Sequence, residues 1–333
     1  METGELRGLR YRCLEGCGFC CTFTPEVAHD ELARLRQAFP KLPVARGEAG
    51  GLHLAFQGGC GACTLLSRRA CTAYGLRPAH CRYFPFHVYF GRRTEAYVNR
   101  TCRGVEPDPV GDLMAEFQAQ VLAVAKPHAI AEHERQARKV HNQFYANAQA
   151  AGLWGDVDAA AARALAEPNL WKDAASEEAW AAALEPFAQE EVVARPFHLA
   201  ADLRWLTFEA RGGRTLQPLR MEEDGSLAAE GPAFEVEPPA LQPATLAQLH
   251  AVLSRMAGRD HFAGTVFDAV DASDYTVPVE VAAAQRVREM AADLLVRCAI
   301  LLRLGVPEAE LAAEAERFYD AAFLDAPTIG GWL

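Results

Sequence analysis

The chain of 333 residues has no long uncharged apolar run. Its longest apolar stretch, residues 281–304, is interrupted by charged side chains, among them Arg286, Arg288, Glu289, Asp293 and Arg297. A membrane-spanning helix needs about 20 consecutive apolar residues, so we expect neither such a helix nor a membrane partner. The first residues, Met-Glu-Thr-Gly-Glu-Leu-Arg, lack an apolar signal region. We therefore expect a cytoplasmic protein.

The sequence also lacks the motifs of several common enzyme classes. It contains no GxGxxG fingerprint, phosphate-binding Walker loop, GxSxG elbow or HExxH pair. The pair Gly212-Gly213 favours a hairpin turn over a phosphate loop. The sequence therefore identifies no catalytic residue and no organic cofactor site, and whether the chain is an enzyme stays open.

Charge is unevenly distributed between the two parts of the chain. Residues 1–109 contain 15 Lys and Arg against 10 Asp and Glu, a net charge of +5. The totals of 33 and 44 leave 18 against 34 for the remainder, a net charge of −16. The acidic remainder argues against nucleic-acid binding, whereas a protein partner is left open. The basic part suits an anionic group of thiolates.

Cysteine is concentrated near the amino terminus. Nine of the ten cysteines lie between Cys13 and Cys102, and the tenth is Cys298. In an exported protein this density would indicate disulfides. Without an export signal, it indicates metal binding. Cys298 is surrounded in the sequence by leucine and isoleucine, which predicts a place in the core.

The spacing of the nine cysteines supports the metal prediction. The predicted ligands are Cys13, Cys17, Cys20, Cys21, Cys60, Cys63, Cys71, Cys81 and Cys102. A two-residue gap between cysteines allows both sulfurs to reach one ion. Thiolates suit zinc and iron–sulfur centres. The alternative is a reduced set of small buried hydrophobic residues.

Three segments carry a resemblance to a known family. They are Cys17-Gly-Phe-Cys20-Cys21, the stretch from Cys63-Thr-Leu-Leu through Cys71-Thr-Ala-Tyr74-Gly-Leu-Arg77-Pro78-Ala-His-Cys81-Arg82-Tyr-Phe-Pro85, and Cys102-Arg-Gly104. With Cys13, they contain eight family-matched cysteines. Together they resemble the YkgJ-type CxxCxxCC cysteine-cluster family, which is described as a zinc- or iron-chelating domain. The resemblance covers roughly residues 11–104. This chain departs from the pattern in the three-residue gap between Cys13 and Cys17, and Cys60 lies outside it.

The resemblance implies a metal-cluster protein with a structural, redox or metal-handling role. We expect an iron–sulfur cluster, [4Fe-4S], in one or two copies, with zinc as the alternative. The eight family-matched cysteines would fill two four-thiolate sites. Cys20 and Cys21 would serve different sites, since neighbouring side chains of an extended chain point to opposite sides. One shared centre is the alternative.

An alternative function also follows from the resemblance. Flagellin lysine N-methylase, a relative of this family, joins a similar cysteine region to a large, mainly helical remainder. The present chain has a remainder of similar character. S-adenosylmethionine-dependent protein lysine N-methylation is therefore the second hypothesis, although no S-adenosylmethionine loop is visible in the sequence.

Periodicity and turn residues predict an α+β fold that is mainly α. We expect a small cysteine-rich metal-binding lobe, residues 1–109, followed by a mostly helical domain, residues 110–333, with a β-hairpin insertion near 203–237. The predicted helices cover residues 25–39, 110–150, 156–193, 245–256, 279–304 and 307–323, and a small hairpin covers residues 86–98.

Side chains near the cysteines have further expected roles. Arg77, Arg82 and Arg103 would donate hydrogen bonds to cluster sulfurs, with ordinary surface charge as the alternative. Three aromatic side chains, Tyr83, Phe84 and Phe86, would shield a cluster from water or simply fill a core. The histidines His80 and His87 are not expected to be ligands, because cysteines are numerous enough.

Overall fold

The structure is a computed structural model that describes residues 1–23, 25–47, 50–125, 127–324 and 326–332. Of residues 109, 127, 128, 193 and 321 only the backbone is described. The fold is α+β and mainly α, as the sequence predicted. In these residues, no helix is long and apolar enough to cross a membrane.

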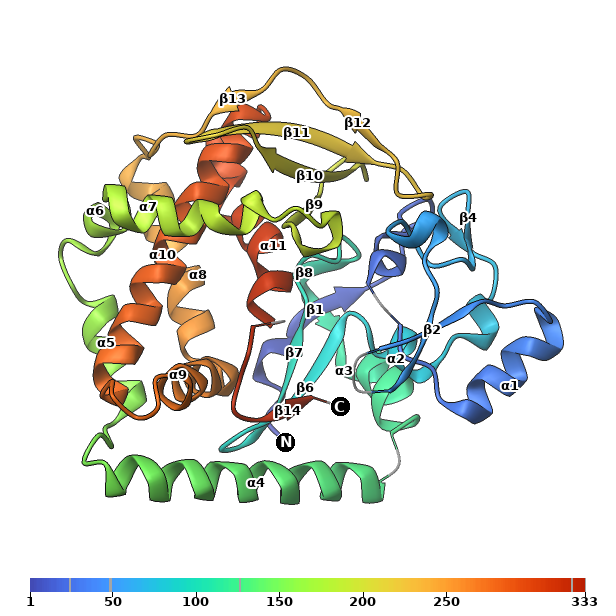
Figure 1. Cartoon of the computed structure of the whole chain (residues 1–333), viewed down its shortest axis with the longest axis horizontal. Coiled ribbons are helices and arrows are strands. Elements are labelled where there is room, and N and C mark those ends of the chain that lie inside the picture. Colours follow the sequence, from blue (N-terminus) through green and yellow to red (C-terminus); the bar gives the residue numbers. More distant parts are fainter. Residues whose placement is uncertain (24, 48–49, 126, 325, 333) are drawn as a thin grey trace.

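The largest core surrounds the long helix α10 (Val279–Arg303), in which 15 of 25 residues are buried. Helices on several sides contact it (Figure 1): α5 (Val157–Leu165), α6 (Leu170–Ala174), α7 (Glu177–Leu184), α8 (Pro243–Ala257), α9 (Asp260–Ala272) and α11 (Leu311–Leu324). Alanine is frequent on these helices, and small side chains let helix axes approach closely. Cys298 lies in this core, as predicted.

Helix α9 was not predicted from the sequence. Its residues from Asp260 to Phe267 are all buried, so it shows no polar stripe that would mark a surface helix. A glycine, Gly264, interrupts its apolar pattern, and a Cβ there would lie 1.9 Å from the hydroxyl of Tyr89. The helix therefore exists because of its tertiary contacts.

An antiparallel sheet lies at one end of the helices (Figure 1), and its strand next to them contacts α11. Its main path is β12 (Leu227–Ala229), β11 (Thr215–Met221), β10 (Trp205–Ala210) and β9 (Phe197–Leu199), and β13 (Phe234–Glu235) pairs with β11. Gly212 and Gly213, both with positive φ, form the turn between β10 and β11. The turn after β11 reaches the cysteine-rich part, where the Ala62 N–H donates to the Glu223 carbonyl over 2.7 Å.

The amino-terminal part consists of short elements. They are α1 (His29–Ala38), β2 (Val44–Arg46), β3 (Leu52–Leu54), β4 (Leu66–Ser67), β5 (Ala70–Cys71), α2 (Ala79–Tyr83), β6 (Phe86–Phe90) and β7 (Thr94–Val98). The predicted helix at residues 25–39 corresponds to α1, and the predicted hairpin corresponds to β6 and β7. A small separate core, which includes Leu35, Leu54 and Leu65, lies under α1.

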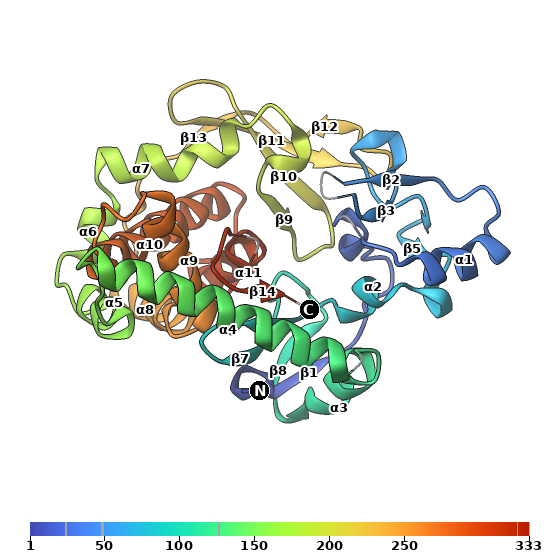
Figure 2. The same ribbon diagram turned by 60° about the horizontal axis from the view of Figure 1, so that its bottom comes forward.

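Long-range strand pairing joins the ends of the chain to this part. The strand β1 (Arg7–Tyr11) pairs with β8 (Val105–Asp112), and β14 (Gly331–Trp332) pairs with β6. Both termini therefore lie near the β6–β7 hairpin (Figure 1). Residues 110–112, expected to be helical, belong to β8, which runs through the predicted boundary at residue 109. The short α3 (Met114–Phe117) follows, and α4 (Pro127–Ala150) runs along one side of the molecule (Figure 2).

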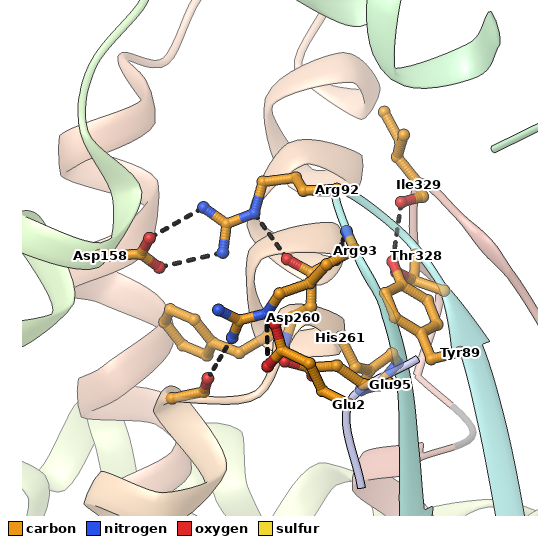
Figure 3. A network of polar contacts seen from close by, with 12 residues as sticks. Glu2, Tyr89, Arg92, Arg93, Glu95, Asp158, Asp260, His261, Thr328 and Ile329 are labelled. Carbon is orange, nitrogen blue, oxygen red and sulfur yellow. Dashed lines mark hydrogen bonds and ion pairs between the residues drawn. The ribbon is translucent and has the colours of Figure 1, made fainter. Parts of the chain in front are cut away.

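A polar network fixes the β6–β7 hairpin to the helices (Figure 3). The guanidinium of Arg92 donates from Nε to Asp260 over 2.6 Å and bridges bidentately to Asp158. The Asp260 N–H at the start of α9 donates to the carboxylate of Glu95 over 2.8 Å. The hairpin is thus held by bonds to α5 and α9 as well as by apolar packing, and its position beside the cysteines is well defined.

Candidate metal centre

The pairing of β1 with β8 brings Cys13 close to Cys102. The strands are antiparallel, and the Arg12 N–H donates to the Gly104 carbonyl over 3.0 Å. The two cysteines continue these facing segments by one or two residues, so their side chains lie near each other. Gly104 permits this approach, because a Cβ there would lie 2.0 Å from the carbonyl oxygen of Arg12.

A tight loop carries the next three cysteines. Gly16 and Gly18 flank Cys17 with φ angles of 73° and 60°, in the left-handed region that glycine adopts without steric cost. A short 3-10 helix follows and carries the adjacent Cys20 and Cys21. The two glycines therefore reverse the chain so that three thiols enter the same region.

Trp205, on β10, supports this loop, and sequence reasoning gave it no role. Its indole N–H donates to the carbonyl of Cys17 over 3.0 Å. The guanidinium of Arg69 stacks on the same indole at 3.5 Å from the ring centroid, and the Arg69 N–H donates to the carboxylate of Glu223. No local signal could have found this contact, because Trp205 and Cys17 are 188 residues apart.

A second group of cysteines gathers around the β4–β5 hairpin. The N–H of Cys63 donates to the carbonyl of Cys21 over 2.8 Å. The hairpin pairs Leu66 with Cys71, which returns Cys71 toward the segment that carries Cys63. Cys81 lies on the single turn of α2. Segments that are 60 residues apart in the sequence are thus joined at one site.

Eight of the nine predicted ligands line one cavity of about 900 Å³: Cys13, Cys17, Cys20, Cys21, Cys63, Cys71, Cys81 and Cys102. Cys60 lines a neighbouring cavity instead, with its Sγ atom 4.0 Å from the carbonyl oxygen of Gly225. The eight are the cysteines that the family pattern contains. Leu199, Leu324 and Trp332 also line the cavity, so the second half of the chain helps to enclose it.

The thiols lie along the cavity wall and do not converge on one point. Among the described residues, no group of three or more His, Cys, Asp or Glu side chains is arranged to hold a metal ion. All ten cysteines are free thiols, and Cys13 and Cys20 are exposed whereas Cys63 is buried. Side-chain rotation would be needed to bring four sulfurs to bonding distance of a metal.

Burial and mutual hydrogen bonds give these thiols different acidities. Burial raises the pKa of Cys81 and of Cys102 to about 12. A hydrogen bond from the Cys21 thiol lowers the pKa of Cys71 to about 6 and also lowers that of Cys20. As the shared donor, Cys21 has a raised pKa. Because a metal binds the deprotonated thiolate, the lowered pKa values of Cys20 and Cys71 favour these two cysteines as ligands.

The electrostatic effects of the thiols on one another indicate two neighbourhoods. Besides burial, the charges of Cys17, Cys20 and Cys13 raise the pKa of Cys102. Besides burial, the charges of Cys63, Cys20 and Cys71 raise the pKa of Cys81. Only Cys20 belongs to both sets. The loop that carries Cys20 and Cys21 therefore lies between a group near the β1–β8 pair and a group near the β4–β5 hairpin.

The three arginines that sequence reasoning singled out have different surroundings. Arg77 acts on the site, because its charge lowers the pKa values of Cys13, Cys20, Cys71 and Cys81. Arg103 donates instead to the carboxylate of Glu314 and to the Leu199 carbonyl. Arg82 does not line the cavity.

The remaining predicted neighbours do line the cavity. Tyr83, Phe84 and Phe86 are on its wall, and so are His80 and His87. Phe86 also belongs to a buried apolar core, against which Tyr83 packs, so these side chains fit both expected roles. Burial lowers the pKa of His87 to about 4, so this imidazole is neutral at physiological pH. The wall thus combines thiols, apolar rings and neutral imidazoles.

Comparison with known proteins agrees with this picture. Residues 12–103 match the CxxCxxCC family, described as a "Putative zinc- or iron-chelating domain". No curated protein and no solved structure gives a significant match to the chain. All nine amino-terminal cysteines lie within the matched segment. The match therefore supports a zinc- or iron-chelating domain in residues 12–103, and it does not extend to the rest of the chain.

Proposed function

We propose that the chain holds two four-thiolate metal centres side by side. The first would use Cys13, Cys17, Cys20 and Cys102, and the second would use Cys21, Cys63, Cys71 and Cys81. The observation that carries this proposal is the shared cavity, which includes these eight cysteines and leaves out Cys60. The two neighbourhoods that meet at Cys20 and Cys21 support the division.

The size and lining of the cavity favour iron–sulfur clusters over zinc. A zinc ion with four sulfurs at about 2.3 Å forms a compact, closed site, and two such sites would fill little of a cavity of about 900 Å³. Each [4Fe-4S] cluster also takes four thiolates but occupies more space. A bound cluster supplies one-electron redox chemistry. The aromatic wall would limit access of water, and Arg77 would offset negative charge.

Anaerobic purification of the full chain tests this proposal. We expect a brown protein with broad visible absorption from iron–thiolate charge transfer, and with iron and inorganic sulfide in equal amounts. A Cys60→Ser variant should retain both contents. A colourless protein with stoichiometric zinc would contradict the iron–sulfur assignment, and loss of metal in Cys60→Ser would contradict the ligand set.

The free state of all ten cysteines fits a reducing compartment, and we propose the cytoplasm as the site of action. Lysine methylation remains the alternative that the resemblance implies, and the described residues add no observation in its favour. Incubation with labelled S-adenosylmethionine and candidate proteins would detect methyl transfer. A pull-down with and without metal would detect a protein partner.

A further inference from the structure

A second cavity, of about 540 Å³, lies between the cysteine-rich part and the helices. Phe19 and Phe23 separate it from the cysteine cavity, since they line both. On the opposite side, Ala179, Ala182 and Ala183 of α7 provide a flat apolar wall. Cavities of this size between structural units, with apolar walls and few polar groups, commonly bind small molecules.

Most of the polar groups that line this cavity come from α10 and α11, and Thr22 and Arg195 add two more. Arg286 donates to Glu289 from one terminal nitrogen over 3.3 Å, but its buried Nε has no partner in the described part of the chain. Tyr319 is only 3% exposed, and no hydrogen bond between described residues includes its hydroxyl. The charge of Arg286 lowers the pKa of this phenol, so the guanidinium and the hydroxyl are neighbours.

The two carboxylates that line the cavity, Asp293 and Glu289, already accept hydrogen bonds from neighbouring side chains. Asp293 accepts two hydrogen bonds from the guanidinium of Arg297, at 3.0 and 3.2 Å. Glu289 accepts from Gln285 over 2.9 Å as well as from Arg286. Among the described residues that line the cavity, the buried atom without a partner is therefore a donor, Arg286 Nε, and an unpaired buried donor is unfavourable. A ligand that satisfies it must carry acceptor oxygens.

We propose that this cavity binds a monocarboxylate with an apolar body. The carboxylate would accept from Arg286 and Tyr319, as guanidinium groups favour this planar acceptor, and the body would lie against the alanines of α7. Both an aliphatic and an aromatic acid have this chemistry. The proposal does not depend on which metal the cysteines hold.

Calorimetric titration of the full, metal-loaded chain tests the proposal. The probes are octanoate and 3-phenylpropanoate, each paired with its neutral amide. We expect one-to-one binding of at least one acid, with the matching amide weaker by about tenfold. Tighter binding of octanoate would indicate an aliphatic ligand, and tighter binding of 3-phenylpropanoate an aromatic one.

Variants locate the binding. Arg286→Met should weaken acid binding by about tenfold, and Tyr319→Phe by a smaller factor. Arg288→Met is the matched control, because Arg288 lies on the same helix but pairs with Glu167 over 2.8 Å outside the cavity. Peptide mass spectrometry after N-ethylmaleimide treatment should show slower labelling of Cys60, which lines the cavity, when the acid is bound.

Three results would overturn the proposal: no binding of either acid at millimolar concentration, equal binding of acid and amide, or equal losses in Arg286→Met and Arg288→Met. If Arg286→Met does not fold, Tyr319→Phe decides. Unchanged binding in that variant, together with unchanged labelling of Cys60, would then refute the site.

Discussion

Adjacent cysteines rarely serve one tetrahedral centre, and Cys20 and Cys21 differ in their surroundings in a way that separates them. Cys20 raises the pKa of Cys102 near the β1–β8 pair as well as that of Cys81, whereas Cys21 acts on its neighbour Cys20 and on Cys71 of the β4–β5 hairpin. We predict that Cys20→Ser and Cys21→Ser each lose one of two centres, and that the lost centres differ. Electron paramagnetic resonance of the reduced protein, with iron and sulfide analysis, measures this.

The control for this pair is Cys60→Ser, which should keep both signals. Identical losses in Cys20→Ser and Cys21→Ser would contradict the two-centre proposal, as would a single cluster in the parent protein. Serine is a suitable replacement because it nearly keeps the size of cysteine and removes the soft sulfur ligand.

A buried histidine provides a pH prediction. His261 lies among Tyr89, Phe323 and Trp332, with ring centroids 4.9–5.2 Å away, and burial lowers its pKa to about 3. Because the unfolded state binds this proton first, the stability it contributes is present above about pH 6.5 and is lost as the pH falls toward 3.

Replacing this histidine by phenylalanine should remove that loss. In His261→Phe, the slope of unfolding free energy against pH, between about pH 6 and pH 4, should decrease by roughly 1.4 kcal/mol per pH unit, the value for one proton. Urea unfolding at several pH values measures the slope. An exposed histidine, His29, is the control. An unchanged slope in His261→Phe would show that His261 is not the titrating group.

At the scale of elements, sequence patterns predicted those helices and strands whose signals lie within one segment of the chain. The β6–β7 hairpin and α10 appear near their predicted positions, because alternation and helical periodicity are encoded within each segment. The β1–β8 pair was missed, since β8 contains Pro107, Pro109 and Gly111, which disfavour strands. Its pairing depends on a partner almost 100 residues away.

The same limit applies to the candidate site. Cysteine spacing and the family resemblance predicted eight side chains that line the cavity. The place of Cys60 in a different cavity could not be predicted, because it depends on the contact of its loop with Gly225. The support of the Cys17 loop by Trp205 was likewise unpredictable. Ligand types are local information, whereas their grouping comes from long-range contacts.

One substitution tests whether the pairing of β1 with β8 positions Cys13 and Cys102. In Gly104→Ala, the added Cβ would lie 2.0 Å from a backbone oxygen of the facing strand. We expect a loss of unfolding free energy of about 1–3 kcal/mol, the usual range for overpacking, and a lower metal content. Thermal unfolding and metal analysis measure both effects.

The matched control is Gly75→Ala, in the same part of the chain, where a Cβ would meet no atom within 4 Å. Its stability and metal content should stay near those of the parent. If the Gly104→Ala protein keeps its full metal content despite lower stability, the strand pair is not required to position the first centre.

At the scale of the whole molecule, the amino-terminal part is held in two different ways. The β6–β7 hairpin is bound to the helices by buried ion pairs such as Arg92–Asp260. The segment with α1 and the β4–β5 hairpin has only a small apolar core of its own, which includes Cys63 and against which Cys21 and Cys71 pack. We infer that metal coordination stabilises this segment, as it does in other small metal-binding units.

Limited trypsin digestion distinguishes the two parts. After metal removal, we expect cleavage first at Arg68 and Arg69, which form the turn of the β4–β5 hairpin. Cleavage at Arg92 and Arg93 should stay slow, because Asp260 binds both residues. The metal-loaded protein should resist cleavage at both positions. Equal cleavage rates at Arg68 with and without metal would contradict a role for coordination in folding. Equal acceleration at Arg92 would mean that the metal stabilises the whole molecule rather than this segment, because the hairpin would then unfold together with it.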